Sequence, residues 1–158
     1  MIQRLLRGIH LAEEAVITLI LAAMVVIAAS QILLRNLFDS GLYWADPLLR
    51  LLVLWLTMLG ALLATRNNHH IRIDLLSRYL SPGWKRINEM VGLTFACLIC
   101  GVLAWHSARF VHYEYLDGAT LFGALPLWMG QLILPVGFAL MTLRFAILTT
   151  LYALGKRP

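Results

Sequence analysis

Residues 44–76 read "WADPLLRLLVLWLTMLGALLATRNNHHIRIDLL" and decide the fold. Between positions 47 and 65 the only charged residue is Arg50, and a polar run begins at Arg66. A helix that rises about 1.5 Å per residue needs about 20 apolar residues to cross a hydrocarbon core of about 30 Å. The stretch therefore predicts a membrane-spanning helix with polar groups at both ends.

Three more apolar runs occupy residues 15–34, 90–105 and 119–143. The chain of 158 residues is 61% hydrophobic and 13% charged, against about 25% charged in an ordinary soluble domain. Because lipid cannot satisfy backbone hydrogen bonds, each run should form a helix. We expect an all-α membrane protein with one domain over residues 1–158 and four transmembrane helices at about 14–35, 47–66, 86–107 and 126–152. The third of these has the shortest apolar run.

Two short amphipathic segments flank these runs. In residues 1–15, apolar side chains recur at helical spacing with Arg4 and Arg7 among them, which favours a helix at the membrane interface. The apolar run that follows is too long for the core of a cleaved signal peptide, so we expect it to remain in the protein. Asp74 can cap a second interfacial helix at about 74–80.

The distribution of Lys and Arg predicts the orientation. Cytoplasmic connections retain positive charge, so the side with more Lys and Arg is expected inside. Ten of the 13 such residues fall in the N-terminal segment, the second connection and the C-terminal end, and only Arg35, Arg50 and Arg109 fall in or beside the first and third connections. We therefore expect both termini in the cytoplasm.

Helix-start signals account for several of the polar residues that flank the apolar runs. Asp46 can cap the second helix, Pro47 has no N–H to lose at a first helical position, and Arg50 can pair with Asp46 at i+4. The same residues could instead meet a partner protein at the outer surface, and both readings stay open. Trp44, Trp84 and Trp128 are expected to anchor helices at the membrane interfaces.

The fourth span contains a predicted irregularity. Pro135 cannot donate a hydrogen bond to the carbonyl of Gln131, so the helix should kink there. Gly130 and Gly137 leave space for a neighbouring helix to approach closely. Arg144 lies near the cytoplasmic end of the span, where it can hold the helix in position.

Other chemistry is poorly supported. Cys97 and Cys100 lie within an apolar run, where small packing residues are expected and a disulfide at i,i+3 is not. His69, His70 and Asp74 lack further ligands nearby, so we predict no metal site and no cofactor. The basic residues form no continuous stripe with aromatics, which argues against a nucleic-acid partner.

The spans also lack the groups that transport requires. Residues 15–34, 51–65, 90–105 and 119–143 contain no Asp, Glu, Lys, Arg or His. A transporter that works alone normally has ionisable groups near the membrane midplane, whereas Glu13 and Glu14 lie at the rim of the first span. A haem protein would need His pairs facing each other between helices, and all five His lie near span ends. We therefore expect no enzyme activity and a role within a complex.

Three patterns, taken together and in order, resemble the small membrane subunit (DctQ type) of TRAP transporters, the tripartite ATP-independent periplasmic systems. They are "YWADPLLRLLVLWLTMLGALLATR", "HHIRIDLL" and "LPLWMGQLILPVGFALMTLRF". The residues that carry the match are Trp44, Asp46, Arg50, Trp55, Gly60, His70, Asp74, Pro126, Trp128, Pro135, Gly137 and Arg144. Family members often have two acidic residues after the Trp, and here Pro47 takes the second place.

The resemblance implies a scaffold in the bacterial inner membrane. Its expected partners are a large membrane subunit that carries the substrate and sodium sites and moves like an elevator, a periplasmic binding protein that delivers a carboxylate-type solute, and membrane lipids. Contacts with the partner proteins are expected at Trp44, Asp46, Arg50, Trp55, Gly60, His70 and Asp74. The alternative is a self-contained four-helix, proton-coupled transporter that acts as a dimer, with Glu14 as the candidate proton carrier.

Overall fold

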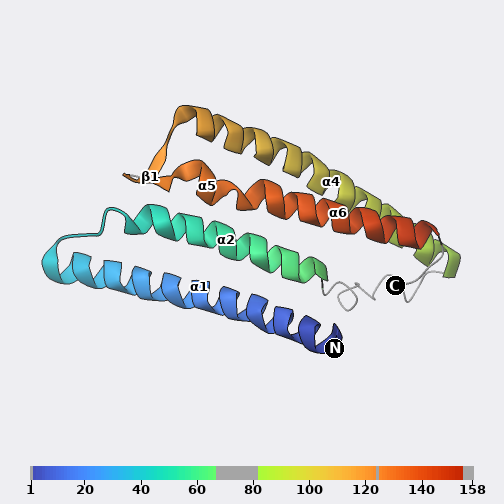
Figure 1. Cartoon of the computed structure of the whole chain (residues 1–158), viewed down its shortest axis with the longest axis horizontal. Helices are drawn as coiled ribbons and strands as arrows, with labels where there is room; N and C mark the ends of the chain where they lie inside the picture. Colours follow the sequence, from blue (N-terminus) through green and yellow to red (C-terminus); the bar gives the residue numbers. More distant parts are fainter. Residues whose placement is uncertain (1, 67–81, 124, 155–158) are drawn as a thin grey trace.

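A computed structural model describes residues 2–66, 82–123 and 125–154, with side chains at 14–65, 87–121, 123 and 125–154. Four long helical segments run side by side (Figure 1). They are α1 (Ile2–Phe38), α2 (Ala45–Arg66), α4 (Pro82–Asp117) and α6 (Ile133–Ala153), the last preceded by the short α5 (Leu127–Gln131). Each of the four contains a stretch long and apolar enough to span a membrane, α5 being counted with α6, so the expectation of an all-α membrane protein with four spanning helices is confirmed.

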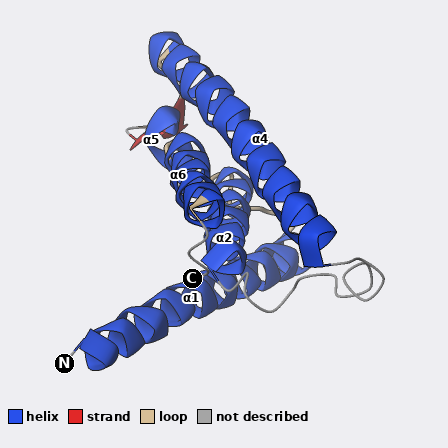
Figure 2. Ribbon diagram, turned by 90° about the vertical axis from the view of Figure 1, so that its right-hand side faces the viewer, coloured by secondary structure: helices blue, strands red, loops and turns tan. Residues whose placement is uncertain are grey.

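The helices form an open row rather than a closed bundle. In Figure 1 the order across the molecule is α1, α2, α6, α4. α1 packs mainly on α2, α2 also packs on α6, and the most extensive contact joins α6 to α4. The N-terminal part of α1 extends away from the other helices (Figure 2). Consequently each end helix has one main neighbour and leaves most of its circumference free.

The interior of this row is small. The buried hydrophobic residues among those described are Ala45, Met58, Val111, Met141, Phe145 and Tyr152. Large apolar side chains are well exposed elsewhere, with Leu19 at 72% and Phe95 at 65%. Exposed apolar area on this scale must be covered by lipid or by another protein, because soluble monomers rarely present it to water.

Helix ends follow local backbone chemistry more than hydropathy. α1 ends at Phe38, where Asp39 adopts a positive φ of 51°. α4 continues ten residues beyond the expected end at 107 and stops at Asp117, followed by Gly118 with φ of 66°. Left-handed residues directly after a helix are a common stop signal, and Gly adopts that conformation without a steric penalty. The third helix is therefore long, although its apolar run is short.

Other boundaries differ from the expectations in smaller ways. α2 begins at Ala45, so Asp46 lies in the first helical turn rather than at the cap, and the Leu48 N–H donates to the Trp44 carbonyl at 3.2 Å. The N-terminal amphipathic segment is continuous with the first span in α1. The helix expected at 74–80 lies outside the described residues. α4 begins at Pro82, four residues before the start expected at about 86, and proline is favoured at a first helical position because it has no N–H to lose.

The predicted irregularity in the fourth span is present. α5 ends at Gln131, Leu132 separates the two helices, and α6 begins at Ile133. Pro135 has no N–H for the Gln131 carbonyl, and helical bonding resumes where Val136 donates to the Leu132 carbonyl at 3.3 Å. Before α5, a two-stranded antiparallel hairpin joins β1 (Thr120–Phe122) to β2 (Leu125–Pro126), a feature that the apolar run at 119–143 does not predict.

A side-chain clamp holds the connection between α1 and α2. The Gln31 side-chain oxygen accepts a hydrogen bond from the Leu42 N–H at 3.0 Å, and its Nε2 donates to the Leu42 carbonyl at 3.3 Å. A Cβ placed on Gly41 would lie 3.4 Å from the same Nε2, which is an ordinary van der Waals contact, so the amide lies directly beside this residue. One glutamine thus fixes the entry of the chain into α2.

Replacing Gln31 with Leu should release this connection. Loss of a hydrogen bond to the backbone costs about 1 kcal/mol, so amide exchange at Leu42 should rise about fivefold in detergent micelles. Gln31→Glu keeps the acceptor for the Leu42 N–H and should have a smaller effect. Asn36→Leu, an exposed polar-to-apolar change on the same helix, is the control. Unchanged exchange at Leu42 in Gln31→Leu would contradict the clamp.

Candidate functional site

One face of α2 stands out because α2 has neighbours on both sides. Between Ala45 and Thr65, six residues have exposed side chains or surfaces, and they recur every three or four positions. Such spacing places them along one side of a helix. We call this set the α2 surface: Asp46, Arg50, Val53, Thr57, Gly60 and Ala64.

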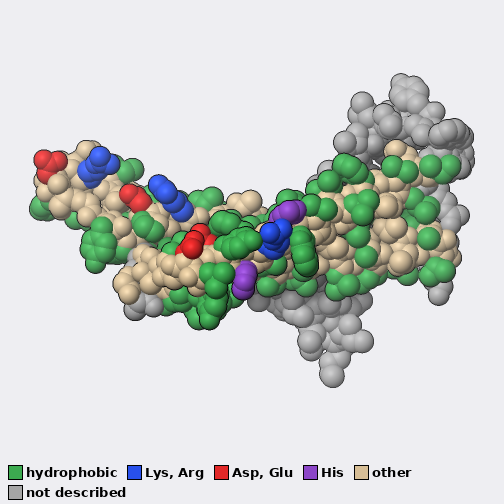
Figure 3. All heavy atoms as spheres, turned by 90° about the horizontal axis from the view of Figure 1, so that it is seen from above, with side chains coloured by type: hydrophobic (Ala, Val, Ile, Leu, Met, Phe, Trp, Pro, Cys, Tyr) green, Lys and Arg blue, Asp and Glu red, His purple; other side chains and the backbone are tan. Residues whose placement is uncertain are grey.

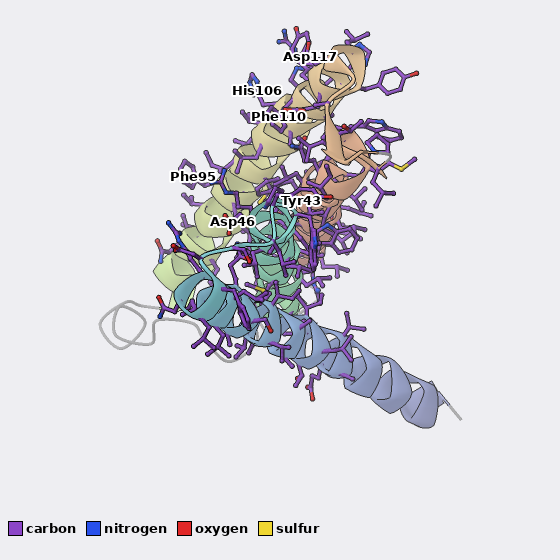
Figure 4. All side chains as sticks on the ribbon, turned by 90° about the vertical axis from the view of Figure 1, so that its left-hand side faces the viewer. Tyr43, Asp46, Phe95, His106, Phe110 and Asp117 are labelled. Atoms are coloured by element: carbon purple, nitrogen blue, oxygen red, sulfur yellow. The ribbon has the colours of Figure 1, made fainter. Side chains whose placement is uncertain are left out.

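The α2 surface is polar at one end and small over the rest. Asp46 lies in the first turn of α2, close to Tyr43, which is 90% exposed (Figure 4). Farther along, the Thr57 hydroxyl donates to the Val53 carbonyl at 2.8 Å, so this polar group is satisfied within its own helix. A Cβ on Gly60 would meet no atom within 4 Å. The surface therefore lets another helix approach the α2 backbone closely.

Asp46 and Arg50 do not form the expected ion pair. Both side chains are exposed, and across the described part of the chain the structure records no carboxylate within bonding distance of Arg50. An exposed pair gains little Coulomb energy in water and loses side-chain freedom, which explains why the spacing alone does not produce it. Both charged groups thus remain available at the end of the α2 surface.

The opposite side of α2 is bound tightly to α5 and α6. The Trp55 indole N–H donates to the Gly130 carbonyl at 2.8 Å. A Cβ on Gly130 would lie 2.6 Å from a δ carbon of Leu51, and one on Gly137 would collide with the terminal methyl group of Met58. The two glycines therefore allow α2 to lie directly against the broken fourth span, as the sequence predicted.

The remaining predicted residues have separate positions. Trp55 faces α5, and its contact with a partner stays a prediction. Trp44 is half-buried just before α2, and Trp128 is half-buried with its ring 5.5 Å from Tyr115 in an edge-to-face contact between α5 and α4. Arg144 is half-buried on α6. His70, Asp74 and the side chain of Trp84 lie outside the described residues.

Sequence reasoning missed half of the α2 surface. Val53, Thr57 and Ala64 carry no charge or aromatic ring and drew no attention. Their signal was available in the spacing, because they continue the three-and-four pattern that starts with Asp46 and Arg50. The pair Gly60 and Ala64 also has the small-residue spacing that recurs at helix contacts in membranes.

The two cysteines are placed where they pack between helices. Cys97 and Cys100 are free thiols at the contact of α4 with α6, and the Cys97 Sγ lies 3.6 Å from the Thr142 carbonyl oxygen. Gly101 lies next to them, with its Cβ position 3.6 Å from the Thr142 methyl group. Over residues 2–66, 82–123 and 125–154, no group of three or more His, Cys, Asp or Glu is placed to hold a metal ion.

Residues 24–154 match the family model described as tripartite ATP-independent periplasmic transporters, DctQ component. The chain belongs to this family of TRAP transporter small permease subunits. It is 33% identical over 119 residues to the C4-dicarboxylate TRAP transporter small permease protein DctQ of Rhodobacter capsulatus, an alignment that takes in 75% of this chain and 52% of that protein. The chain thus spans about half the length of that relative.

Two further relatives are informative. The protein of the same name from Pseudomonas aeruginosa is 28% identical over 170 residues, covering 85% of this chain and 79% of the relative. The sialic acid TRAP transporter permease protein SiaT of Haemophilus influenzae is 32% identical over 109 residues, covering 63% of this chain but only 18% of SiaT. Together with the four spanning helices, these matches place this TRAP small permease subunit in the bacterial inner membrane as a multi-pass protein.

Proposed function

We propose that this small permease subunit is a scaffold that holds a large TRAP membrane subunit in place while the solute crosses through that large subunit. The observation that carries the proposal is the α2 surface on a chain of this family: a smooth face with charged groups at one end, on a helix that is fixed from behind by Trp55 and Gly130. A scaffold needs a rigid contact face, and the exposure of the α2 surface and the contacts behind it support this role.

The chemistry of the spans supports transport through another polypeptide. The apolar runs at 15–34, 51–65, 90–105 and 119–143 contain no Asp, Glu, Lys, Arg or His, and Arg144 follows the last of them, nine residues before the fourth span ends at Ala153. Membrane proteins that bind ions near the midplane use Asp, Glu, His, Lys or unwound backbone there. The break at Leu132, between the described helices α5 and α6, lies beside a tight contact with α2 rather than a charged group.

The four exposed faces differ in a way that favours α2 as the contact with protein. Helix contacts in membranes are enriched in small residues, since lipid chains and large aliphatic side chains are equally apolar. The α2 surface contains Thr57, Gly60 and Ala64, whereas the exposed positions of α6 include Val136, Leu140, Leu143 and Ile147. Those of α4 are likewise mostly large, whereas α1 exposes Ala15, Ala22 and Ala29 among larger side chains.

The relative SiaT supports a permanent partner. There the matched region occupies 18% of a much longer protein that is named a permease. A module that is covalently joined to the rest of a permease in one protein is expected to meet a comparable partner by non-covalent contact where it is a separate chain. In this proposal Asp46 and Arg50 lie at the periplasmic side and can also contact the solute-delivering protein, and His70 and Asp74 stay predicted partner contacts.

The names of the relatives suggest the solute class. They refer to C4-dicarboxylates and to sialic acid, which are both carboxylates. We propose uptake of a carboxylate-type solute, driven by sodium, with both termini of this chain in the cytoplasm.

Reconstitution in vesicles tests the proposal. Vesicles with this chain alone should accumulate no dicarboxylate or sialic acid under a sodium gradient, and vesicles that also contain a cognate large subunit and a loaded binding protein should accumulate one of them. Omission of this chain from the full system should reduce uptake at least about tenfold. Uptake by this chain alone, abolished by Glu14→Gln, would support the proton-coupled alternative instead.

A further inference from the structure

The exposed face of α4 has a chemistry unlike that of the α2 surface. Six exposed residues recur every three or four positions and therefore lie along one side of the helix. We call them the α4 stripe: Phe95, Leu98, Val102, Trp105, Arg109 and Tyr113. Phe95 and His106 lie on the side of α4 that is turned away from α6 (Figure 4). The stripe is thus open to whatever surrounds the molecule in the membrane.

The far end of the stripe presents an oriented cation. The Arg109 Nη2 donates to the Tyr113 hydroxyl at 3.1 Å, and the Arg109 Cζ lies 5.9 Å from the centre of the Tyr113 ring. Both contacts hold the guanidinium against the helix surface. Because a guanidinium has five N–H donors, most of its donors remain for an anion. No carboxylate is recorded in an ion pair with Arg109 in the portion of the chain that the structure describes.

Two histidines add donors next to Arg109. His106 and His112 are exposed, three residues before and three residues after it. Figure 3 views the molecule from the α4 side, where His, Lys or Arg, and Asp or Glu side chains lie close together within a largely apolar surface. An imidazole N–H can donate to an oxyanion even when the ring is neutral. Arg109 and the two imidazoles thus offer N–H donors to an oxyanion on this side of α4, ahead of Glu114 and Asp117 along the helix.

The order of residues along α4 indicates the source of the phosphate. The polar patch comes directly after an apolar segment that runs from Phe95 to Trp105, which is about 15 Å along the helix. This length is about half of a 30 Å hydrocarbon core, or one leaflet. Apolar side chains, then Trp105 and then Arg109 follow the same order as acyl chain, interface and phosphate in a phospholipid.

We propose that the α4 stripe binds one anionic phospholipid, with its phosphate at Arg109, His106 and His112 and an acyl chain along Phe95, Leu98 and Val102. The large side chains of the stripe suit a flexible chain, whereas a second helix would favour the small residues found on α2. The lipid lies in the leaflet at the end of the molecule that contains the β1–β2 hairpin. The proposal does not depend on the scaffold function.

Native mass spectrometry of the purified full chain with phosphatidylglycerol or phosphatidylcholine tests the proposal. One phosphatidylglycerol should remain bound at collision energies that remove phosphatidylcholine. Arg109→Gln should weaken retention about tenfold, because it removes a charge-assisted bond, and Arg109→Lys should restore part of it. Arg50→Gln, which removes an exposed arginine from α2, is the matched control and should leave retention unchanged.

Further measurements distinguish a bound phospholipid from a free phosphate or a protein partner. Tyr113→Phe should weaken retention about twofold to threefold, since it frees the guanidinium without removing its charge. Glycerol phosphate at millimolar concentration should fail to displace the lipid, because it lacks the acyl chains. Equal retention in Arg109→Gln, displacement by glycerol phosphate, or a photo-crosslinker at Val102 that captures a protein in the assembled transporter would each overturn the proposal.

Discussion

Replacing Gly60 with Leu is expected to separate this subunit from its large partner while leaving its own fold intact. A Cβ at Gly60 meets nothing within 4 Å in the chain, so the isolated protein has space for the side chain. A Leu in place of Gly within a helix should even stabilise the chain by up to about 1 kcal/mol. In the complex the same side chain would stand between α2 and a closely packed neighbour.

The expected effect on assembly is large. Overpacking a close helix contact typically costs about 1–3 kcal/mol, which corresponds to a complex weaker by about 5-fold to 150-fold. Co-purification with the tagged large subunit and solute uptake by the reconstituted system should both fall, whereas thermal unfolding of the isolated chain should shift upward or not at all. This opposite response of stability and assembly would distinguish a contact surface from a structural defect.

Gly92 provides a matched control. It is an exposed glycine within α4, and its Cβ position also meets nothing within 4 Å. Gly92→Leu should stabilise the isolated chain to a similar degree and leave assembly and uptake unchanged. If Gly92→Leu blocked assembly and Gly60→Leu did not, the large subunit would contact α4 and the assignment of the α2 surface would be wrong.

The fold could be predicted from the sequence where a single physical requirement determines the local structure. Four apolar runs require four helices because a backbone in lipid must satisfy its own hydrogen bonds. Pro135 predicted the break near Leu132 because it lacks an N–H. The length of α4 was missed, since His106 to Asp117 is polar and hydropathy ends the span there. The helix continues because residues 106–117 contain no Gly or Pro, and it ends where Gly118 adopts a positive φ.

The candidate site could be predicted only in part. Asp46, Arg50 and Gly60 were selected from the sequence, and helical spacing is enough to place them on one face. Their exposure depends on which sides of α2 are covered by α1 and α6, and this is a property of the packing. The Trp55–Gly130 hydrogen bond joins residues 75 positions apart, so it depends on the relative register of two helices that no local pattern specifies.

Among substitutions that add a single carbon atom to this chain, Gly130→Ala is expected to cause the largest loss of stability. The new Cβ would lie 2.6 and 2.7 Å from the two δ carbons of Leu51 and 3.2 Å from its Cγ. Rotation about χ2 of Leu51 leaves its Cγ in place, and the helix restricts rotation about χ1, so we expect α2 and α5 to move apart. The same movement lengthens the bond from the Trp55 indole to the Gly130 carbonyl, now 2.8 Å.

The net effect should be a loss of about 2 kcal/mol. Overpacking costs about 1–3 kcal/mol and a weakened buried hydrogen bond about 1 kcal/mol more, against a gain of up to about 1 kcal/mol from the helix preference of Ala. Gly137→Ala should behave differently, because its collision is with the terminal methyl group of Met58, which can rotate away. Its stability should be unchanged or higher.

A double-mutant cycle can attribute the loss to the contact with Leu51. Leu51→Ala removes every Leu51 atom that the new Cβ would meet, so Leu51→Ala combined with Gly130→Ala should be more stable than the sum of the two single changes predicts, by about 1–2 kcal/mol. Unfolding in mixed detergent micelles, followed by circular dichroism, gives the four free energies. Additive effects, or equal losses for Gly130→Ala and Gly137→Ala, would show that α2 is not held against α5 at this crossing. Other contacts would then have to keep the α2 surface in position.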